Sequence, residues 1–288
     1  MRGAGRLLAC AAALLLASCG GKGEVDIATL ASSSDQIIWE AGQKAYEKKN
    51  WEAARQHFKR IVDAFPQSEY GPAARIALGD SYFNEGGVAN YILAVSDYRD
   101  FLTLYPSHPR SDYAQLQVAE CHFRQRNGPD RDQTETEKAL AEFQRLVELY
   151  PQSSFVETAR QRIAETRYSL ARAEFLAGYF YQRSRRAYRA AVARYETILT
   201  DYPDYSGTDE VLFRMGECLM AQGRRAEALP QLSRLVETYP ESGFLEEARK
   251  LIDVIASTPA PVPAQVPEPA ASPTPSPSPT PGAAAQLK

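Results

Sequence analysis

The 288-residue sequence predicts an all-α fold, a solenoid of five stacked helix pairs followed by a disordered C-terminal tail. The first observation behind this prediction is a short phrase, an aromatic residue and a proline followed by mostly small or polar residues, that occurs five times. The second is a small residue that holds the same place in four of the helices expected before these phrases. The third is a change of composition at Ser257, after which the chain is rich in Pro, Ala, Ser and Thr and nearly uncharged.

The second helix of each pair is predicted by the residues that precede the five prolines. Ala stands twelve residues before each proline, Phe, Tyr or Leu eight before, and Ile, Leu or Phe five before. Steps of four and three place these side chains on one face of a helix, and proline ends the helix because it disfavours helical geometry in the preceding residue. The five sets are Ala54, Phe58, Ile61 and Pro66; Ala94, Tyr98, Phe101 and Pro106; Ala139, Phe143, Leu146 and Pro151; Ala191, Tyr195, Ile198 and Pro203; and Ala228, Leu232, Leu235 and Pro240.

A first helix is expected before each of these second helices. Gly42 stands twelve residues before Ala54, and Gly79, Ala119 and Gly216 hold the same place in their own segments. A small residue that faces an Ala would let two antiparallel helices approach closely. The pattern resembles the tetratricopeptide repeat, a helix-turn-helix unit of about 34 residues. Since one such unit cannot bury its own apolar face, the units must stack.

Residues 35–254 are therefore expected to form a solenoid of five repeats, three of which depart from the pattern. The second has three extra residues around Gly86, and the third has eight between its helices, including the run GPDRDQT. In the fourth, Tyr179 stands at the place of the small residue and Gly178 comes one place earlier. Its first helix is expected to be long, over 156–182.

The N-terminus has the pattern of an export signal. Residues 1–6 are positively charged, and residues 7–17 form an apolar run that is too short to span a membrane as a mature helix. The run ends in LASC at Cys19, which resembles the lipobox of bacterial lipoproteins. A plain secretory peptide with an incidental Cys is the alternative.

The lipobox resemblance implies a processing route and a location. Residues 1–18 would be removed as a signal peptide, Cys19 would carry the lipid (palmitate among its acyl chains), and residues 19–34 would be a flexible tether. Gly20 after the Cys implies the outer membrane, with the protein facing the periplasm. At the other end, residues 255–288 cannot bury enough apolar surface to fold, so a disordered tail is expected, acting as a spacer or as a binding segment.

Composition and motifs argue against several classes of function. The net charge of −3 and the lack of any run of Lys or Arg argue against nucleic-acid binding. No catalytic motif is present, and the three histidines have no metal-ligand spacing. Cys121 and Cys218 are expected to be buried apolar residues two repeats apart. We therefore expect no enzyme, no catalytic residue, no metal, and no cofactor beyond the covalent lipid on Cys19.

A repeat protein without a catalytic site usually binds partners on the concave surface that its first helices form. The repeat family lines this groove with residues at fixed places around the small residue. Whether these side chains form a groove or pack between repeats is left open by the sequence. In the first three repeats they are Trp39, Gln43, Tyr46, Ile76, Asp80, Phe83, Asn84, Leu116, Glu120 and Phe123.

Several phrases are similar to the BamD family, also called ComL or YfiO, of outer-membrane assembly lipoproteins. They are YGP at 70–72, FLTLYPSHPRSDY at 101–113, DRDQT at 130–134 and AEFQRLVELYPQS at 141–153. Together with the lipobox they extend the resemblance over residues 19–250. The Pro-rich tail is not part of the family pattern.

The resemblance implies a non-enzymatic lipoprotein subunit of the machinery that assembles β-barrel proteins in the outer membrane. Its partners would be unfolded barrel proteins, the periplasmic domains of the central barrel-assembly protein, and other assembly lipoproteins. Arg194 stands where an Arg of the family contacts the central protein. The alternatives are a periplasmic repeat lipoprotein that coordinates envelope constriction or peptidoglycan synthesis, and an enzyme whose site the sequence hides.

Overall fold

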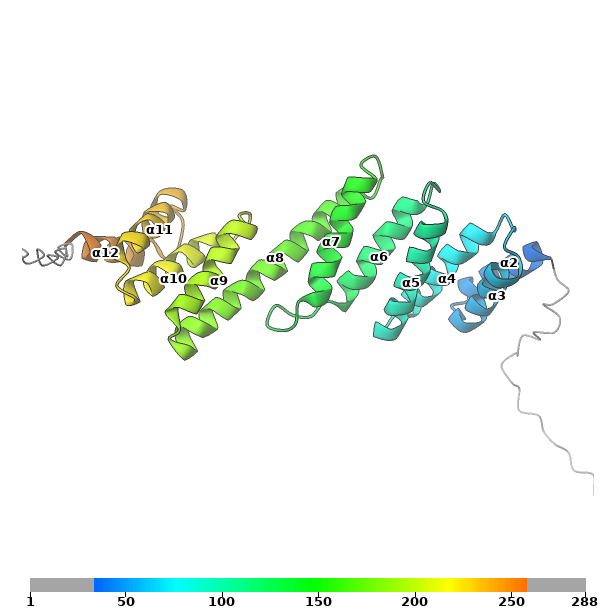
Figure 1. Cartoon of the computed structure of the whole chain (residues 1–288), viewed down its shortest axis with the longest axis horizontal. Coiled ribbons are helices and arrows are strands. Elements are labelled where there is room, and N and C mark those ends of the chain that lie inside the picture. The colour runs from blue at the N-terminus through cyan, green and yellow to red at the C-terminus, as the bar shows by residue number, and fades with distance from the viewer. Residues whose placement is uncertain (1–33, 258–288) are drawn as a thin grey trace, which may run out of the picture.

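The computed structural model describes residues 34–257, and this part is helical throughout: eleven α-helices, one π-helix and no strand. The helices form antiparallel pairs that stack in a row (Figure 1). The predicted tetratricopeptide-repeat solenoid is thus confirmed. Its elements are α2 (Asp35–Glu47) and α3 (Trp51–Ala64) in unit 1; α4 (Gly71–Glu85) and α5 (Val88–Leu104) in unit 2; α6 (Ser111–Gln125) and α7 (Thr134–Leu149) in unit 3; α8 (Val156–Phe180), η1 (Tyr181–Arg185) and α9 (Tyr188–Asp201) in unit 4; α10 (Thr208–Ala221) and α11 (Arg225–Thr238) in unit 5; and α12 (Leu245–Ser257).

The recurring phrase forms the same turn each time. The aromatic residue before each proline is the C-cap of a second helix, with φ between −123° and −131°. Its carbonyl accepts a hydrogen bond from the backbone N–H three residues later, as in Ser68 to Phe65 and Ser153 to Tyr150, both at 2.9 Å. In units 1, 3 and 5 a serine hydroxyl of the turn also donates to an Asp in the first turn of the unit's own first helix. These pairs are Ser68–Asp35, Ser153–Asp112 and Ser242–Asp209, at 2.6, 2.6 and 2.7 Å.

The small residues make room for the large side chain of the facing helix, not for its Ala as we expected. A Cβ added to Gly79 would lie 2.8 Å from the Tyr98 ring, and one added to Gly42 would lie 2.6 Å from the Phe58 ring. In unit 4 the residue in this role is Gly178, whose Cβ would lie 2.7 Å from the Tyr195 ring. The π-helix η1, with its wider turn, absorbs the extra residue that displaces Gly178 from the pattern.

The insertions have two different outcomes. In unit 2 the turn between the helices is only Gly86-Gly87, both at positive φ, and the extra residues lengthen α5 to 17 residues. In unit 3 the extra residues form the loop 126–133 between α6 and α7.

The solenoid ends in an unpaired helix that we did not predict. The apolar side chains of α12 pack against the cluster of units 4 and 5, with Ala248 fully buried. The helix covers the last apolar face as a cap and runs to Ser257, past the expected boundary at 254.

The long helix α8 joins units 1–3 to units 4 and 5. Its first turn belongs to the apolar cluster of unit 3, through Val156 and Ala159, whereas Ala171 and Phe175 belong to the cluster of units 4 and 5. Cys121 and Cys218 are buried and free in different clusters, as expected. Burial raises the pKa of each thiol to about 12.

Cys19, the signal peptide, the tether apart from Ser34, and residues 258–288 lie outside the described residues, so the predictions for them stay predictions. No helix within residues 34–257 combines the length and apolar character needed to cross a bilayer.

Candidate functional site

An open pocket of about 260 Å³ lies between the first helices of units 1 and 2. Aromatic side chains form one wall, the small residues Ala73 and Ala77 of α4 form another, and acidic and amide side chains of both first helices also line the pocket. Arg110, from the turn before unit 3, completes the rim. The lining residues are Trp39, Gln43, Tyr46, Glu47, Phe58, Ala73, Ala77, Asp80 and Arg110.

The aromatic wall is held rigid by ring contacts. Trp39 stacks on Tyr70 with ring centroids 5.7 Å apart and an interplanar angle of 19°, and it tilts against Phe58 at 5.4 Å. Tyr46 meets Trp51 edge to face at 5.2 Å. Trp39 and Tyr46 are half-buried. They therefore present fixed apolar surface to the pocket with little conformational entropy left to lose on binding.

The acid of the pocket, Asp80, is fixed by two tyrosines. Its Oδ1 accepts hydrogen bonds from the hydroxyls of Tyr98, at 2.6 Å, and Tyr113, at 2.9 Å. Burial raises the pKa of Asp80, while the two hydrogen bonds act in the opposite direction. Because the tyrosines come from α5 and α6, this carboxyl group ties the pocket wall to units 2 and 3.

Tyr46 carries a polar edge as well as an apolar face. Its hydroxyl accepts a hydrogen bond of 2.7 Å from the exposed amide of Asn84, and burial raises the pKa of this phenol. Of the predicted groove residues, the structure thus brings Trp39, Gln43, Tyr46 and Asp80 into one pocket, with Asn84 beside it.

The other predicted groove residues do not line this pocket. Ile76 is 0% exposed in the core between α4, α5 and α6, so its assignment to a groove was wrong. Phe83 packs against Tyr91 at 5.9 Å and lies under the guanidinium of Arg124 at 4.5 Å.

In unit 3 the predicted stripe is covered. Leu116 and Phe123 are buried in the unit's core cluster, so their assignment to an open groove was also wrong. Arg162 of α8 reaches over the Phe123 ring at 4.4 Å and bonds the Glu120 carboxylate at 2.9 Å. Unit 3 loses its groove because the Arg162 side chain covers it.

Sequence reasoning missed the far wall of the pocket. Ala73 and Ala77 are four residues apart on α4, and two small residues at this spacing leave a hollow beside a neighbouring helix. Arg110 comes from the turn between units 2 and 3, which only the stacking brings close.

Arg194 lies away from this pocket, on α9. Its Nη1 donates to both carboxylate oxygens of Glu174 on α8, at 3.1 and 3.0 Å. The bond to Glu174 raises the pKa of the guanidinium. Both ends of this pair are accessible to solvent. Within the helical part, residues 34–257, no three His, Cys, Asp or Glu side chains are grouped as a metal site would require.

Comparison of the sequence with known proteins finds a matching family and several curated relatives. A family described as "YfiO: Outer membrane lipoprotein" matches residues 31–228. The chain is 27% identical to the outer membrane protein assembly factor BamD of Caulobacter vibrioides, over 86% of this chain and 80% of that protein. It is 25% identical to the BamD of Rickettsia prowazekii, over 75% of this chain and 84% of that protein. Among solved structures, the TPR2AB domain of yeast Sti1 matches over 77% of this chain and 98% of its own, with a TM-score of 0.41 and 12% identity.

Proposed function

This chain belongs to the YfiO family of outer membrane lipoproteins, and we propose that it serves the assembly of β-barrel proteins as a receptor for their unfolded chains. Its relatives are named as outer membrane protein assembly factors, which supports a role in that process. In this role, the pocket of units 1 and 2 binds extended barrel segments, and Arg194 in unit 4 docks the central barrel-assembly protein. The lipid on Cys19 anchors the chain to the outer membrane, facing the periplasm.

The observation that carries the proposal is the pocket that Trp39 and Tyr46 line. An extended peptide presents alternate side chains to a surface, and barrel strands alternate apolar and polar residues with aromatic girdles at both ends. An aromatic side chain of such a strand would enter the hollow at Ala73 and Ala77, with Trp39 on its other side. The exposed amides of Gln43 and Asn84 can hydrogen-bond the main chain of the strand.

The ion pair at Arg194 supports the second part of the proposal. A pair between exposed side chains is worth only about 0–1 kcal/mol, so a carboxylate of a partner can replace Glu174 at little cost. Arg194 lies in unit 4 and the pocket lies in units 1 and 2, and α8 separates them. The chain can therefore bind a barrel segment and the central barrel-assembly protein at the same time.

The test is capture of the tagged chain from detergent-solubilised outer membranes. The wild-type chain should bring down a large barrel protein with periplasmic domains. Arg194→Ala should reduce that capture at least about tenfold, as expected when one charged hot spot of an interface is lost, while the binding of barrel peptides stays unchanged. Arg249→Ala is the matched control, since it removes another exposed ion pair, the one with Glu246.

Capture of peptidoglycan synthases in place of a barrel protein would contradict the proposed function. Equal capture by wild type and Arg194→Ala would contradict the role of Arg194 alone.

A further inference from the structure

The turns of the solenoid lie on two opposite edges. Each unit is an antiparallel pair and the units stack in the same orientation, so the turns within units share one edge and the turns between units share the other. Figure 1 shows the α6–α7 and α8–α9 turns along the lower edge and the α7–α8 and α9–α10 turns along the upper edge. We call these the intra-unit edge (residues 48–50, 86–87, 126–133, 181–187 and 222–224) and the inter-unit edge (65–70, 105–110, 150–155, 202–207 and 239–244).

The two edges have opposite charge. The intra-unit edge carries eight Lys and Arg and two acidic residues, a net charge of +6, in a chain whose own net charge is −3. The inter-unit edge carries one Arg and three acidic residues, a net charge of −2. Within the described part of the chain, only one of the eight cations forms an ion pair, Arg224 with Glu227. The cations are Lys48, Lys49, Arg126, Arg131, Arg183, Arg185, Arg186 and Arg224.

The positive charge is densest at the α8–α9 turn. From Phe175 to Tyr195 the chain has five arginines and no acidic residue. Arg183, Arg185 and Arg186 are all exposed, and none of them pairs with a carboxylate anywhere in residues 34–257. Three like charges within four residues repel one another, and this repulsion opposes folding of the turn.

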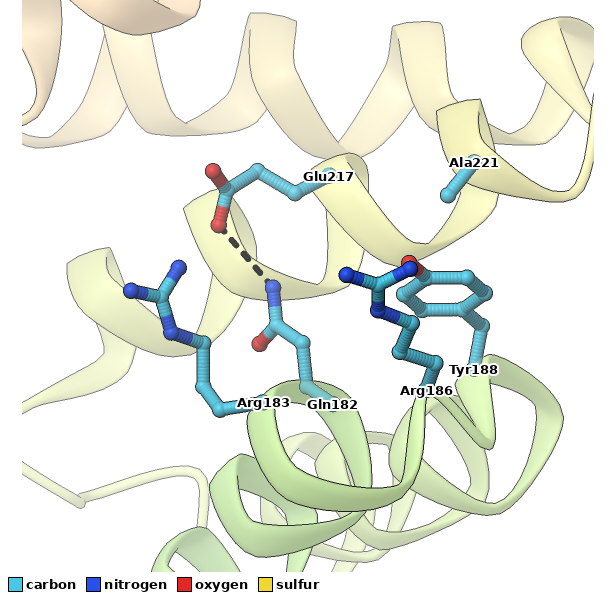
Figure 2. Close-up of a pocket in the computed structure, with 6 residues that line it drawn as sticks. All are labelled: Gln182, Arg183, Arg186, Tyr188, Glu217 and Ala221. Atoms are coloured by element: carbon cyan, nitrogen blue, oxygen red, sulfur yellow. Dashed lines mark hydrogen bonds between the residues drawn. The ribbon is translucent and has the colours of Figure 1, made fainter.

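The π-helix and its C-cap residue, Arg186, place two of these arginines around a hollow. Figure 2 shows the side chains of Arg183 and Arg186 on either side of Gln182, all three directed toward α10. Together they border a pocket of about 540 Å³, with Glu217 and Ala221 on its opposite wall. The Glu217 Oε2 is already bonded by Gln182 at 3.0 Å and by Arg214 at 3.1 Å. The guanidinium groups of Arg183 and Arg186, which pair with no carboxylate within residues 34–257, keep their donors for an anion from outside.

We propose that the intra-unit edge, with the α8–α9 turn as its main contact, binds the anionic phosphate headgroups of a phospholipid bilayer. One guanidinium group can donate two parallel hydrogen bonds to two oxygens of the same phosphate. Phe180 is 48% exposed at the same turn, with Arg185 5.6 Å over its ring, and offers an apolar group to the interface.

The distribution of charge favours a membrane over an acidic protein. The cations follow one edge through units 1, 3, 4 and 5, which suits a flat and extended anionic surface better than a compact patch on a protein. The inference uses the proposed lipid anchor only to place the chain beside a bilayer. The fifteen residues between Cys19 and Asp35 can span up to about 50 Å when extended. This is more than twice the length of a 15-residue helix, which sets the distance between the two edges. The anchor therefore leaves the intra-unit edge free to reach the membrane.

The test is cosedimentation of the processed chain, residues 19–288, with lipid vesicles, so that the apolar leader adds nothing to the binding. The chain carries Cys19→Ala, so that no acyl chain contributes to binding. We expect binding to vesicles that contain phosphatidylglycerol, none to vesicles of phosphatidylcholine alone, and weaker binding as salt is raised. The triple variant Arg183→Gln, Arg185→Gln and Arg186→Gln should bind at least about tenfold more weakly.

A second triple variant has the same net charge and is the matched control. Arg160→Gln, Arg234→Gln and Lys250→Gln remove three exposed cations that lie outside the turns of this edge, and this variant should bind within about twofold of the parent. Failure of the parent chain to bind phosphatidylglycerol, or equal losses in both triple variants, would overturn the proposal.

Capture of the barrel partner, measured in parallel, separates this inference from the proposed function. The arginine triple variant should keep that partner. Loss of the partner with unchanged vesicle binding would show that the edge binds an acidic protein and not lipid. Loss of vesicle binding alone would leave the proposed function standing.

Discussion

Gly79→Leu is expected to lower the melting temperature of the solenoid by about 10 °C. A Cβ at this position would lie 2.8 Å from the ring of Tyr98, which is itself 0% exposed. The ring cannot withdraw without breaking its hydrogen bond to Asp80. Overpacking costs about 1–3 kcal/mol, and a lost hydrogen bond to a charged group adds about 1.5–3 kcal/mol.

Gly243→Leu is the matched control, because a Cβ at Gly243 meets nothing within 4 Å. It should melt within about 2 °C of the wild type, as surface substitutions usually do. Thermal unfolding followed by circular dichroism compares the two variants. If Gly79→Leu and the control melted at the same temperature, the close contact of Gly79 with Tyr98 between α4 and α5 would be wrong.

Replacing Trp39 and Tyr46 together with Ala is expected to weaken the binding of an aromatic barrel peptide by at least about a hundredfold. Each ring is a fixed anchor of the pocket, and the loss of such an anchor typically costs about 2 kcal/mol, while about 1.4 kcal/mol corresponds to one decade in affinity. Fluorescence anisotropy of a labelled peptide with the sequence of a last barrel strand measures the change.

Phe83→Ala is the control for this experiment. Phe83 is a half-buried aromatic residue of a first helix, like Tyr46, but it packs against Tyr91 outside the pocket. It should bind the peptide as the wild type does, and circular dichroism should find both variants folded. An intact affinity in the Trp39 and Tyr46 variant would mean that these rings only pack the solenoid.

Most of the fold could be predicted from sequence because the constraint is local and repeated. The spacing from Ala54 to Pro66 fixes one helix face and one helix end, and the chain repeats that spacing five times. Two features could not be predicted in this way. Helix α12 has no proline-ended partner to mark it, and the displaced Gly178 fits its role only because η1 adds a wider turn.

The candidate site could be predicted only where one unit meets its regular neighbour. Trp39, Gln43, Tyr46 and Asp80 stand at the positions that a row of identical repeats would expose. The rule fails at Leu116 and Phe123, because Arg162 of α8 reaches back over unit 3 from the place that Ala77 holds in α4. Such contacts depend on which side chain the neighbouring unit carries at that place, which periodicity within one unit does not contain.

The central claim is that the pocket of units 1 and 2 receives unfolded barrel proteins, and site-specific photocrosslinking in living cells tests it most directly. A photoreactive residue in place of Gln43, which is exposed at the pocket, should crosslink to newly exported barrel proteins. The same residue in place of Gln144, exposed on the second helix of unit 3, should not. Crosslinks to barrel proteins from Gln43 alone are the predicted result. No such crosslinks from Gln43, or equal yields from both positions, would contradict the claim.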